Sequence, residues 1–440
     1  MHLFLNLFSN KQFFLSTLFA LLPLSFIAGN MIININVLMI ILATLFLYRE
    51  RVFQLKFYWL DILIFTYFLL ILITAIINDY SFFLEQLEWK GYYSTVIKSL
   101  LFLKYLFLYI VVRFVIENKI IHLKYFFIIS SISVLFVCFD IVFQLLNGKD
   151  IFGFEIEGSG RKLGGPFGDE YIAGGFIQRF SILSFFILPI FYSKLSKRYS
   201  KFLIPCLFII FLLGIILSGN RMPLILFLFA TFLIIIFDKR TRKYILTFIA
   251  IFSLIFFLFF KFNQEVRYNF SGFKTQISNM IVILLDGKES NVNQPLYLKE
   301  FSTFYNTWQM NKFVGGGIKN FRYYCHVRPF IDPNSKFICN MHPHNYYLEI
   351  LTETGIIGFT IILLIFFNVL FISFFKKYFS NLPLENNDKM IPFIFLFIAE
   401  IFPLKSTGSF FTTGSATYIF LILGIIIGLA RSNNLIENKF

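Results

Sequence analysis

Residues 201–237 read KFLIPCLFIIFLLGIILSGNRMPLILFLFATFLIIIF, two apolar runs joined by a short polar turn. Each run approaches the ~20 residues that a helix needs to cross the hydrocarbon core of a bilayer. A backbone in lipid must satisfy its hydrogen bonds internally, so such runs form helices. The stretch therefore predicts a helical hairpin that crosses a membrane twice.

The same pattern recurs along the 440 residues, of which 58% are hydrophobic and 14% are charged. Soluble domains carry about 25% charged residues, so a soluble fold is excluded. We expect an all-α, polytopic integral membrane protein with about twelve transmembrane helices, the first of them an anchor rather than a signal peptide. The predicted spans are 12–29, 31–48, 58–78, 95–116, 124–146, 172–193, 201–218, 222–237, 243–260, 345–375, 390–405 and 412–430.

Lysine and arginine gather in alternate short loops, which the positive-inside rule assigns to the cytoplasm. These loops are 49–56, 113–124, 194–201, 238–243 and 376–389. Both termini are then cytoplasmic, and residues 261–344 form one large periplasmic loop. This loop separates an N-terminal bundle of about nine spans (1–260) from about three C-terminal spans (345–440). Because much of the +15 net charge lies in membrane-flanking loops, we expect contact with membrane lipids and no nucleic-acid partner.

The four cysteines fall into two pairs. Cys138 and Cys206 lie in apolar runs and are expected to pack there. Cys325 and Cys339 lie in the large loop, and in an oxidising periplasm we expect a disulfide, with two free thiols as the alternative. The loop offers neither a common zinc-ligand spacing nor paired carboxylates, so we predict no metal, and no other cofactor.

Residues 342–349, HPHNYYLE, mark the point where the large loop turns into an apolar run. Pro343 suits the first turn of a helix whose N-terminus faces the periplasm and favours an anion. Asn345 and Glu349 are four residues apart and share a helix face. Histidine accepts protons near neutral pH, so His344 is a candidate general base. His342 is the other candidate for the base. The alternative to a base is a histidine that only caps a helix at the interface.

Other parts of the sequence also carry candidate ligands. Arg221 in the turn 218–221 (SGNR) and Arg161 in 160–170 (GRKLGGPFGDE) suit a diphosphate, because guanidinium binds phosphate through two hydrogen bonds. The alternatives are snorkelling to lipid head groups for Arg221 and an ordinary solvated charge for Arg161. Lys405, near the last outer turn, is a weaker candidate. The glycine run in 315–322 (GGGIKNFR) allows close backbone approach to a ligand.

Together, these segments resemble the O-antigen ligase/polymerase family of bacterial envelope glycosyltransferases. The resemblance is carried by 315–322, by 342–358, by 218–221 and more loosely by 165–169, and it spans about residues 150–430. It implies transfer of a glycan from undecaprenyl diphosphate without metal or nucleotide. It also implies His344 as the base, Asn345 orienting the base or the sugar, and a diphosphate or substrate site drawn from Arg221, Arg322, Arg161, His342 and Glu349. Relatives often carry a basic residue on the helix before the glycine run, whereas residues 301–308 here read FSTFYNTW.

The function that we expect is an inverting O-antigen ligase in lipopolysaccharide biosynthesis. It would lie in the bacterial inner membrane with its active site facing the periplasm, and lipid A-core oligosaccharide would be the acceptor. One alternative is a polysaccharide polymerase that uses a second lipid-linked repeat unit as acceptor. Another is a transporter or flippase for a lipid-linked sugar. The transporter is less favoured because the polar groups gather at one face, whereas transporters bind near the midplane.

Overall fold

The computed structural model describes residues 11–84, 94–156, 162–238, 245–262, 296–327, 344–379 and 387–433, with Cys339 and a few residues between 264 and 278. Helices account for the regular structure there, and no strand occurs beyond one isolated β-bridge. Nine of these helical segments are long and apolar enough to cross a membrane. Three shorter apolar helices occupy the remaining predicted positions. The predicted all-α polytopic membrane fold is confirmed.

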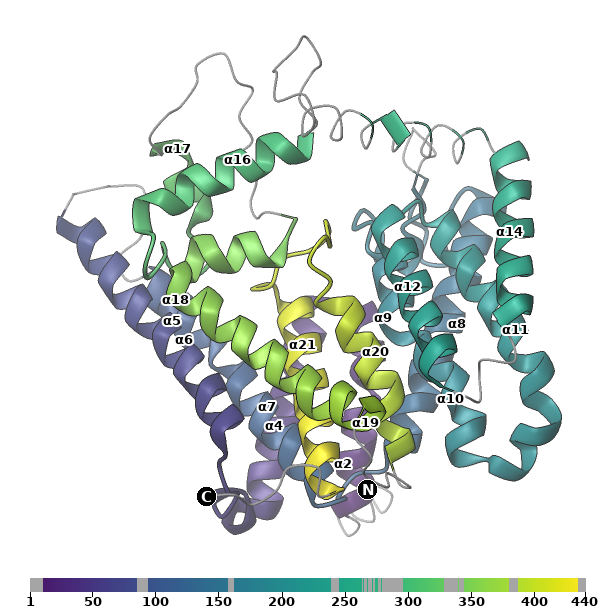
Figure 1. The fold of residues 1–440 in the computed structure, drawn as a ribbon, viewed down its shortest axis with the longest axis horizontal. Coiled ribbons are helices and arrows are strands. Elements are labelled where there is room, and N and C mark those ends of the chain that lie inside the picture. The colour runs from purple at the N-terminus through teal and green to yellow at the C-terminus, as the bar shows by residue number, and fades with distance from the viewer. Residues whose placement is uncertain are drawn as a thin grey trace.

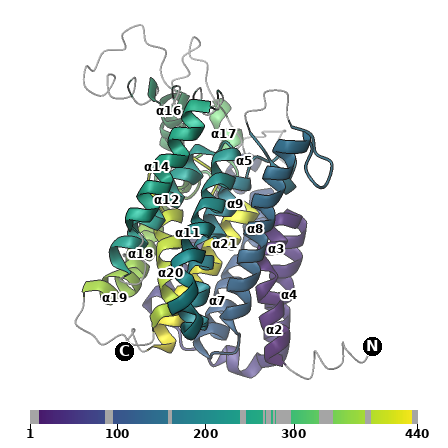
Figure 2. The same cartoon turned by 90° about the vertical axis from the view of Figure 1, so that its right-hand side faces the viewer.

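The helices of the N-terminal half stand on both sides of the view in Figure 1, with α5 and α6 at the left and α8 and α10 at the right. Figure 2 shows its first helices along one flank, with α16 above the bundle. The helices of this half are α2 (Lys11–Ala20), α3 (Leu22–Ala28), α4 (Asn30–Phe53), α5 (Trp59–Leu84), α6 (Ser94–Phe102), α7 (Lys104–Glu117), α8 (Leu123–Asn147), α9 (Ala173–Phe180) and α10 (Ile182–Phe191).

The second half adds further spans and a short helical layer at one end (Figure 1). Its helices are α11 (Ser193–Leu217), α12 (Arg221–Phe237), α14 (Ile245–Phe262), α16 (Leu296–Trp308), α17 (Phe321–Val327), α18 (Tyr346–Leu370), α19 (Lys376–Phe379), α20 (Ile391–Glu400) and α21 (Thr413–Ser432). A π-helical turn, Phe371–Phe375, links α18 to α19.

Helix α21 is the most enclosed membrane-length helix and packs along α7. Two glycines one turn apart allow the close approach. A Cβ on Gly424 would lie 2.9 Å from a methyl carbon of Val112, and one on Gly428 would lie 2.9 Å from the Arg113 carbonyl. Small residues at this spacing let membrane helices pack by direct backbone contact. The last helix is therefore central to the bundle.

Arg113 falls in both the predicted span 95–116 and the predicted loop 113–124, and the structure shows that it belongs to the helix. The residue lies inside α7 and is completely buried. Its guanidinium pairs with Asp61 at 2.5 Å and donates to the Lys56 carbonyl at 2.7 Å. Asp61 lies in the first turn of α5, where a carboxylate is favoured by the helix dipole. The partner in another helix thus allows the charge to stay inside the bundle.

Helix α20 has ten residues and rises ~15 Å, about half the thickness of a bilayer core. The chain continues as a non-helical segment from 401 to 412, in which Ile401, Lys405 and 409–411 are buried. The predicted span 390–405 therefore ends early, at Glu400. Irregular backbone at this depth is tolerated where it is enclosed by protein or lines a cavity. We call residues 401–412 the outer loop.

Candidate functional site

A cavity of about 1150 Å³ lies between the outer loop and the N-terminal ends of α9 and α12. Its walls combine residues that are far apart in the chain. Arg221 and His344, two of the residues selected from the sequence, line it together. Apolar side chains of α3, α4 and α12, including Phe26, Ile33 and Ile225, complete the walls. The cavity thus offers cationic and apolar surfaces to one ligand.

Arg221 enters the cavity from the tight turn between α11 and α12. In this turn Asn220 Nδ2 donates to the Ser218 carbonyl at 3.0 Å, and Ser218 Oγ donates to the Ile215 carbonyl at 2.7 Å. Helix α9 packs directly on the turn, since a Cβ on Gly174 would lie 2.5 Å from Ser218 Oγ. The glycine therefore brings the beginnings of α9 and α12 to the same wall.

Asn345 is the N-cap of α18. Its Oδ1 accepts from the backbone N–H groups of Tyr347 and Leu348 at 3.0 and 3.1 Å. Its Nδ2 donates to the carbonyls of Pro403 and Lys405 at 2.8 and 3.3 Å. An Asn side chain has two donors and an acceptor oxygen, so its capacity is used within the protein. This geometry favours a positioning role for Asn345.

The helix begins at Tyr346, so the prediction that Pro343 occupies its first turn is wrong. The capping amide fixes the start of the helix three residues later than the proline suggested. Pro343 and the candidate His342 lie outside the described residues. His344 directly precedes the cap and lines the cavity.

Glu349 is buried one turn into α18, where it holds the outer loop. Its carboxylate accepts from Ser409 Oγ and from the Phe410 N–H, each at 2.5 Å. The side chain is absent from the described cavity wall. Both contacts favour a role in shaping the loop over direct contact with a substrate.

The glycine run 315–317 approaches α18 rather than a ligand. The N–H groups of Gly316 and Gly317 donate to the carbonyls of Thr352 and Glu353 at 3.0 and 2.9 Å. Helix α18 breaks at Gly355, whose φ of 64° lies in the left-handed region. The predicted single span 345–375 is therefore bent into two limbs (Figure 1). The run locks the first limb in place through backbone contacts.

A buried polar cluster lies beneath the outer loop, and of its residues the sequence analysis selected only Lys405, as a weaker candidate ligand. Glu400 Oε1 accepts from Arg179 Nη2 and Lys405 Nζ, both at 2.7 Å, and from the Tyr346 hydroxyl at 2.6 Å. Arg179 Nη2 also donates to Ser415 Oγ at 3.2 Å. Lys405 Nζ lies 3.0 Å from the Tyr346 hydroxyl. Three helices, α9, α18 and α20, thus meet the outer loop at one carboxylate, and α21 joins them through the contact of Ser415 with Arg179.

The cluster left a signal in the sequence. Arg179 and Glu400 are charged residues inside the predicted spans 172–193 and 390–405. Ionisable residues within membrane spans are rare and usually mark a partner or a site. Their pairing depends on how α9 and α20 pack, which no local spacing reveals.

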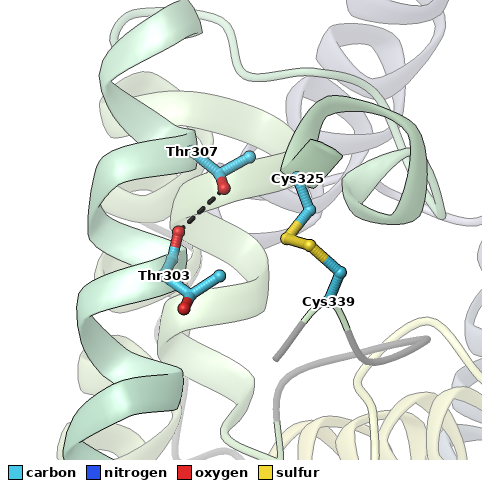
Figure 3. Close-up of a disulfide and its surroundings, with 4 residues drawn as sticks. All are labelled: Thr303, Thr307, Cys325 and Cys339. Carbon is cyan, nitrogen blue, oxygen red and sulfur yellow. Dashed lines mark hydrogen bonds between the residues drawn. A yellow bond between two sulfur atoms is a disulfide. The ribbon is translucent and has the colours of Figure 1, made fainter. Parts of the chain in front are cut away.

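The remaining candidates lie elsewhere. Arg322 is on α17 and is not one of the described residues that line the cavity. Arg161 falls outside the part of the chain that the structure describes. Cys325 and Cys339 form a disulfide with a Cα–Cα distance of 5.7 Å. Figure 3 shows it beside α16, where Thr307 donates to the Thr303 carbonyl. The bond therefore ties the segment before His344 to α17.

Comparison with known proteins gives one finding. Residues 206–363 match the family model described as O-antigen ligase. The matched region contains Arg221, the glycine run, His344 and Asn345, so it confirms the resemblance drawn from the sequence. It supports a membrane glycosyltransferase of the O-antigen ligase or polymerase kind. A search of curated proteins finds no match to the chain.

Proposed function

We propose that this protein transfers a glycan from undecaprenyl diphosphate to lipid A-core oligosaccharide at the periplasmic face of the inner membrane. The observation that carries the proposal is the shared cavity wall of His344 and Arg221. A transfer from a lipid diphosphate needs a base for the acceptor hydroxyl and a cation for the leaving group. The same wall includes Phe26 and Ile33, which suit the prenyl chain of an amphiphilic donor.

In the proposed reaction, the imidazole of His344 takes the proton of an acceptor hydroxyl. The hydroxyl oxygen attacks the anomeric carbon and forms the new glycosidic bond. The bond from this carbon to the diphosphate oxygen breaks, and undecaprenyl diphosphate leaves with the electron pair. Attack opposite to the leaving group inverts the anomeric centre.

Arg221 stabilises the charge that develops on the leaving diphosphate. The N-terminal end of α12, where Arg221 lies, adds backbone N–H groups with a favourable dipole. Asn345 acts on the base indirectly, because it fixes the start of α18 directly after His344. The cap and the outer loop together keep His344 at the wall opposite the donor.

The test is reconstitution of the purified protein in liposomes with a defined undecaprenyl-diphosphate glycan. Products are resolved by mass, with and without lipid A-core. Glycan on lipid A-core only when that acceptor is present supports the ligase. A ladder of longer lipid-linked glycans without lipid A-core shows a polymerase instead. Absence of any covalent product under both conditions contradicts a transferase and favours a transporter.

A further inference from the structure

The cluster of Arg179, Glu400, Lys405 and Tyr346 holds more positive than negative charge. Glu400 is the one carboxylate that pairs with Arg179 or Lys405 among the described residues. Two cations therefore share one carboxylate. A buried charge that is not compensated is costly, so an anion in contact with the cluster is favoured.

Both cations face the cavity. Arg179 and Lys405 line it, whereas Glu400 lies behind them and does not appear in the wall. The hydrogen bonds of Arg179 use Nε and Nη2, which leaves Nη1 without a partner among the described residues. A guanidinium held along one edge in this way offers its other nitrogen to a ligand.

Two acidic residues of the cavity wall, Asp169 and Glu170, do not neutralise the cluster. Asp169 and Glu170 are exposed, and neither forms an ion pair with Arg179 or Lys405. The surplus positive charge is thus available to a bound anion.

We propose that Arg179 and Lys405 form a second anion subsite in the wall that Arg221 also lines, and that it binds a phosphate of the polyprenyl diphosphate carrier. The inference rests on the proposed function, because that function supplies a diphosphate. One diphosphate has two phosphate groups, and the wall then offers cations to both. Glu400 and Tyr346 are positioning residues, which hold the two cations toward the cavity.

Titration of Lys405 should make ligand binding depend on pH, which a purely structural bond between helices would not do. Burial lowers the pKa of its ammonium to about 8, with the adjacent Arg179 adding to the effect and Glu400 opposing it. Tyr346 faces it from α18, while His344 and Glu300 share the cavity wall with it. Loss of the Lys405 proton therefore removes one cation from the subsite above pH 8.

The experiment measures binding of undecaprenyl diphosphate to the full-length protein in nanodiscs, without acceptor, from pH 7 to pH 9. Undecaprenyl monophosphate and inorganic diphosphate are compared as ligands. We expect Lys405→Met and Arg179→Gln each to raise the Kd for the lipid diphosphate about tenfold. The exposed Lys201→Met is the matched control and should leave the Kd unchanged. Each substitution should weaken the binding of the monophosphate less than it weakens the binding of the diphosphate.

Lys405→Arg keeps the positive charge throughout this pH range. Wild-type affinity should fall as the pH rises through about 8, whereas this variant should show a flatter profile. Because both proteins see the same ligand, titration of the diphosphate cancels in the comparison. This measurement also remains decisive if the neutral variants fail to fold.

Two results would overturn the subsite. One is a folded Lys405→Met protein that binds the lipid diphosphate within twofold of wild type. The other is an identical pH profile for wild type and Lys405→Arg. Binding that depends on Lys405 in a protein that makes no glycan product would instead contradict the proposed function and leave the subsite intact. Equal affinity for inorganic and lipid diphosphate would reject the lipid carrier as the source of the phosphate.

Discussion

The side-chain amide of Asn345 donates a hydrogen bond of 3.3 Å to the carbonyl of Lys405, while its oxygen caps α18. One side chain therefore fixes two parts of the cavity wall relative to each other. His344 directly precedes the cap, and Lys405 belongs to the anion subsite that we propose. The geometry of the base and that of the leaving group are thereby coupled.

Two substitutions of Asn345 distinguish its role as the cap of α18 from its contact with the outer loop. Asn345→Ala should lower stability by about 1–2 kcal/mol through loss of the cap, and glycan transfer should fall as well. Asn345→Asp keeps a good cap but sets a carboxylate oxygen against the carbonyls of Pro403 and Lys405. It should therefore retain much of the stability and still lose transfer. Thermal unfolding and product formation measure the two effects.

Asn368→Ala is the control for this pair, because the half-buried Asn368 side chain bonds to a carbonyl of its own helix. It should match wild type in both measurements. Glycan transfer by Asn345→Asp at the wild-type rate would refute the coupling between the cap and the outer loop.

Gly315 and Gly355 should tolerate no side chain. A Cβ on Gly315 would lie 2.4 Å from the Glu353 carbonyl carbon, and one on Gly355 would lie 2.2 Å from the Phe313 carbonyl oxygen. Both glycines have positive φ, and the obstacles are backbone atoms that no rotamer change relieves. Alanine at either position should cost about 3 kcal/mol or more and lower the melting temperature.

Gly175→Ala is the matched control, since a Cβ there meets nothing within 4 Å and the residue is helical. Its melting temperature should equal or exceed that of wild type. A Gly355→Ala protein with the same melting temperature as Gly175→Ala would show that the bend between the two limbs of α18 does not depend on close packing against the glycine run.

Glu400→Gln tests the cluster as a structural unit. The change leaves Arg179 and Lys405 without their carboxylate in a buried setting. Removal of one partner from a buried ion pair typically costs about 3–5 kcal/mol. We expect a large fall in the melting temperature, whereas the exposed Glu50→Gln should have little effect. An unchanged melting temperature would mean that Glu400 does not anchor the two cations.

Much of the fold was predictable because lipid imposes strong local rules. Hydropathy located the positions of the spans, and the loop in the neighbourhood of His344 was recognised by its polar composition. The break in α18 and the early end of α20 were not predicted. Gly355 lies in an apolar run whose hydropathy does not change there, and only the packing of the glycine run against it reveals the bend.

The site was predictable where one residue carries the chemistry and unpredictable where several segments share it. Arg221 and His344 were selected from the residues next to them in the sequence, and both line the cavity. Arg179 and Glu400 were hidden in apolar runs, because their importance lies in a contact between distant helices. Arg322 followed from the resemblance alone, and the structure places it on α17 away from the described wall.

Arg221 and Arg322, two of the candidate arginines, therefore lead to predictions of different size. Arg221→Met should reduce the transfer rate about 100-fold, because a cation in the wall stabilises the leaving diphosphate. Arg322→Met should reduce it less than about tenfold, because Arg322 lies outside the wall. Steady-state transfer assays on both variants measure the difference. Equal losses would show that Arg322 reaches the donor and that the cavity is incomplete as described.

The most direct test of the central claim is single-turnover glycan transfer by His344→Ala in liposomes loaded with donor and lipid A-core. Loss of the general base should slow product formation by about 10²–10⁴ while donor binding stays within a fewfold of wild type. His122→Ala, an exposed histidine in a predicted cytoplasmic loop, serves as the control and should keep the wild-type rate. Product formation by His344→Ala at the wild-type rate would contradict the account.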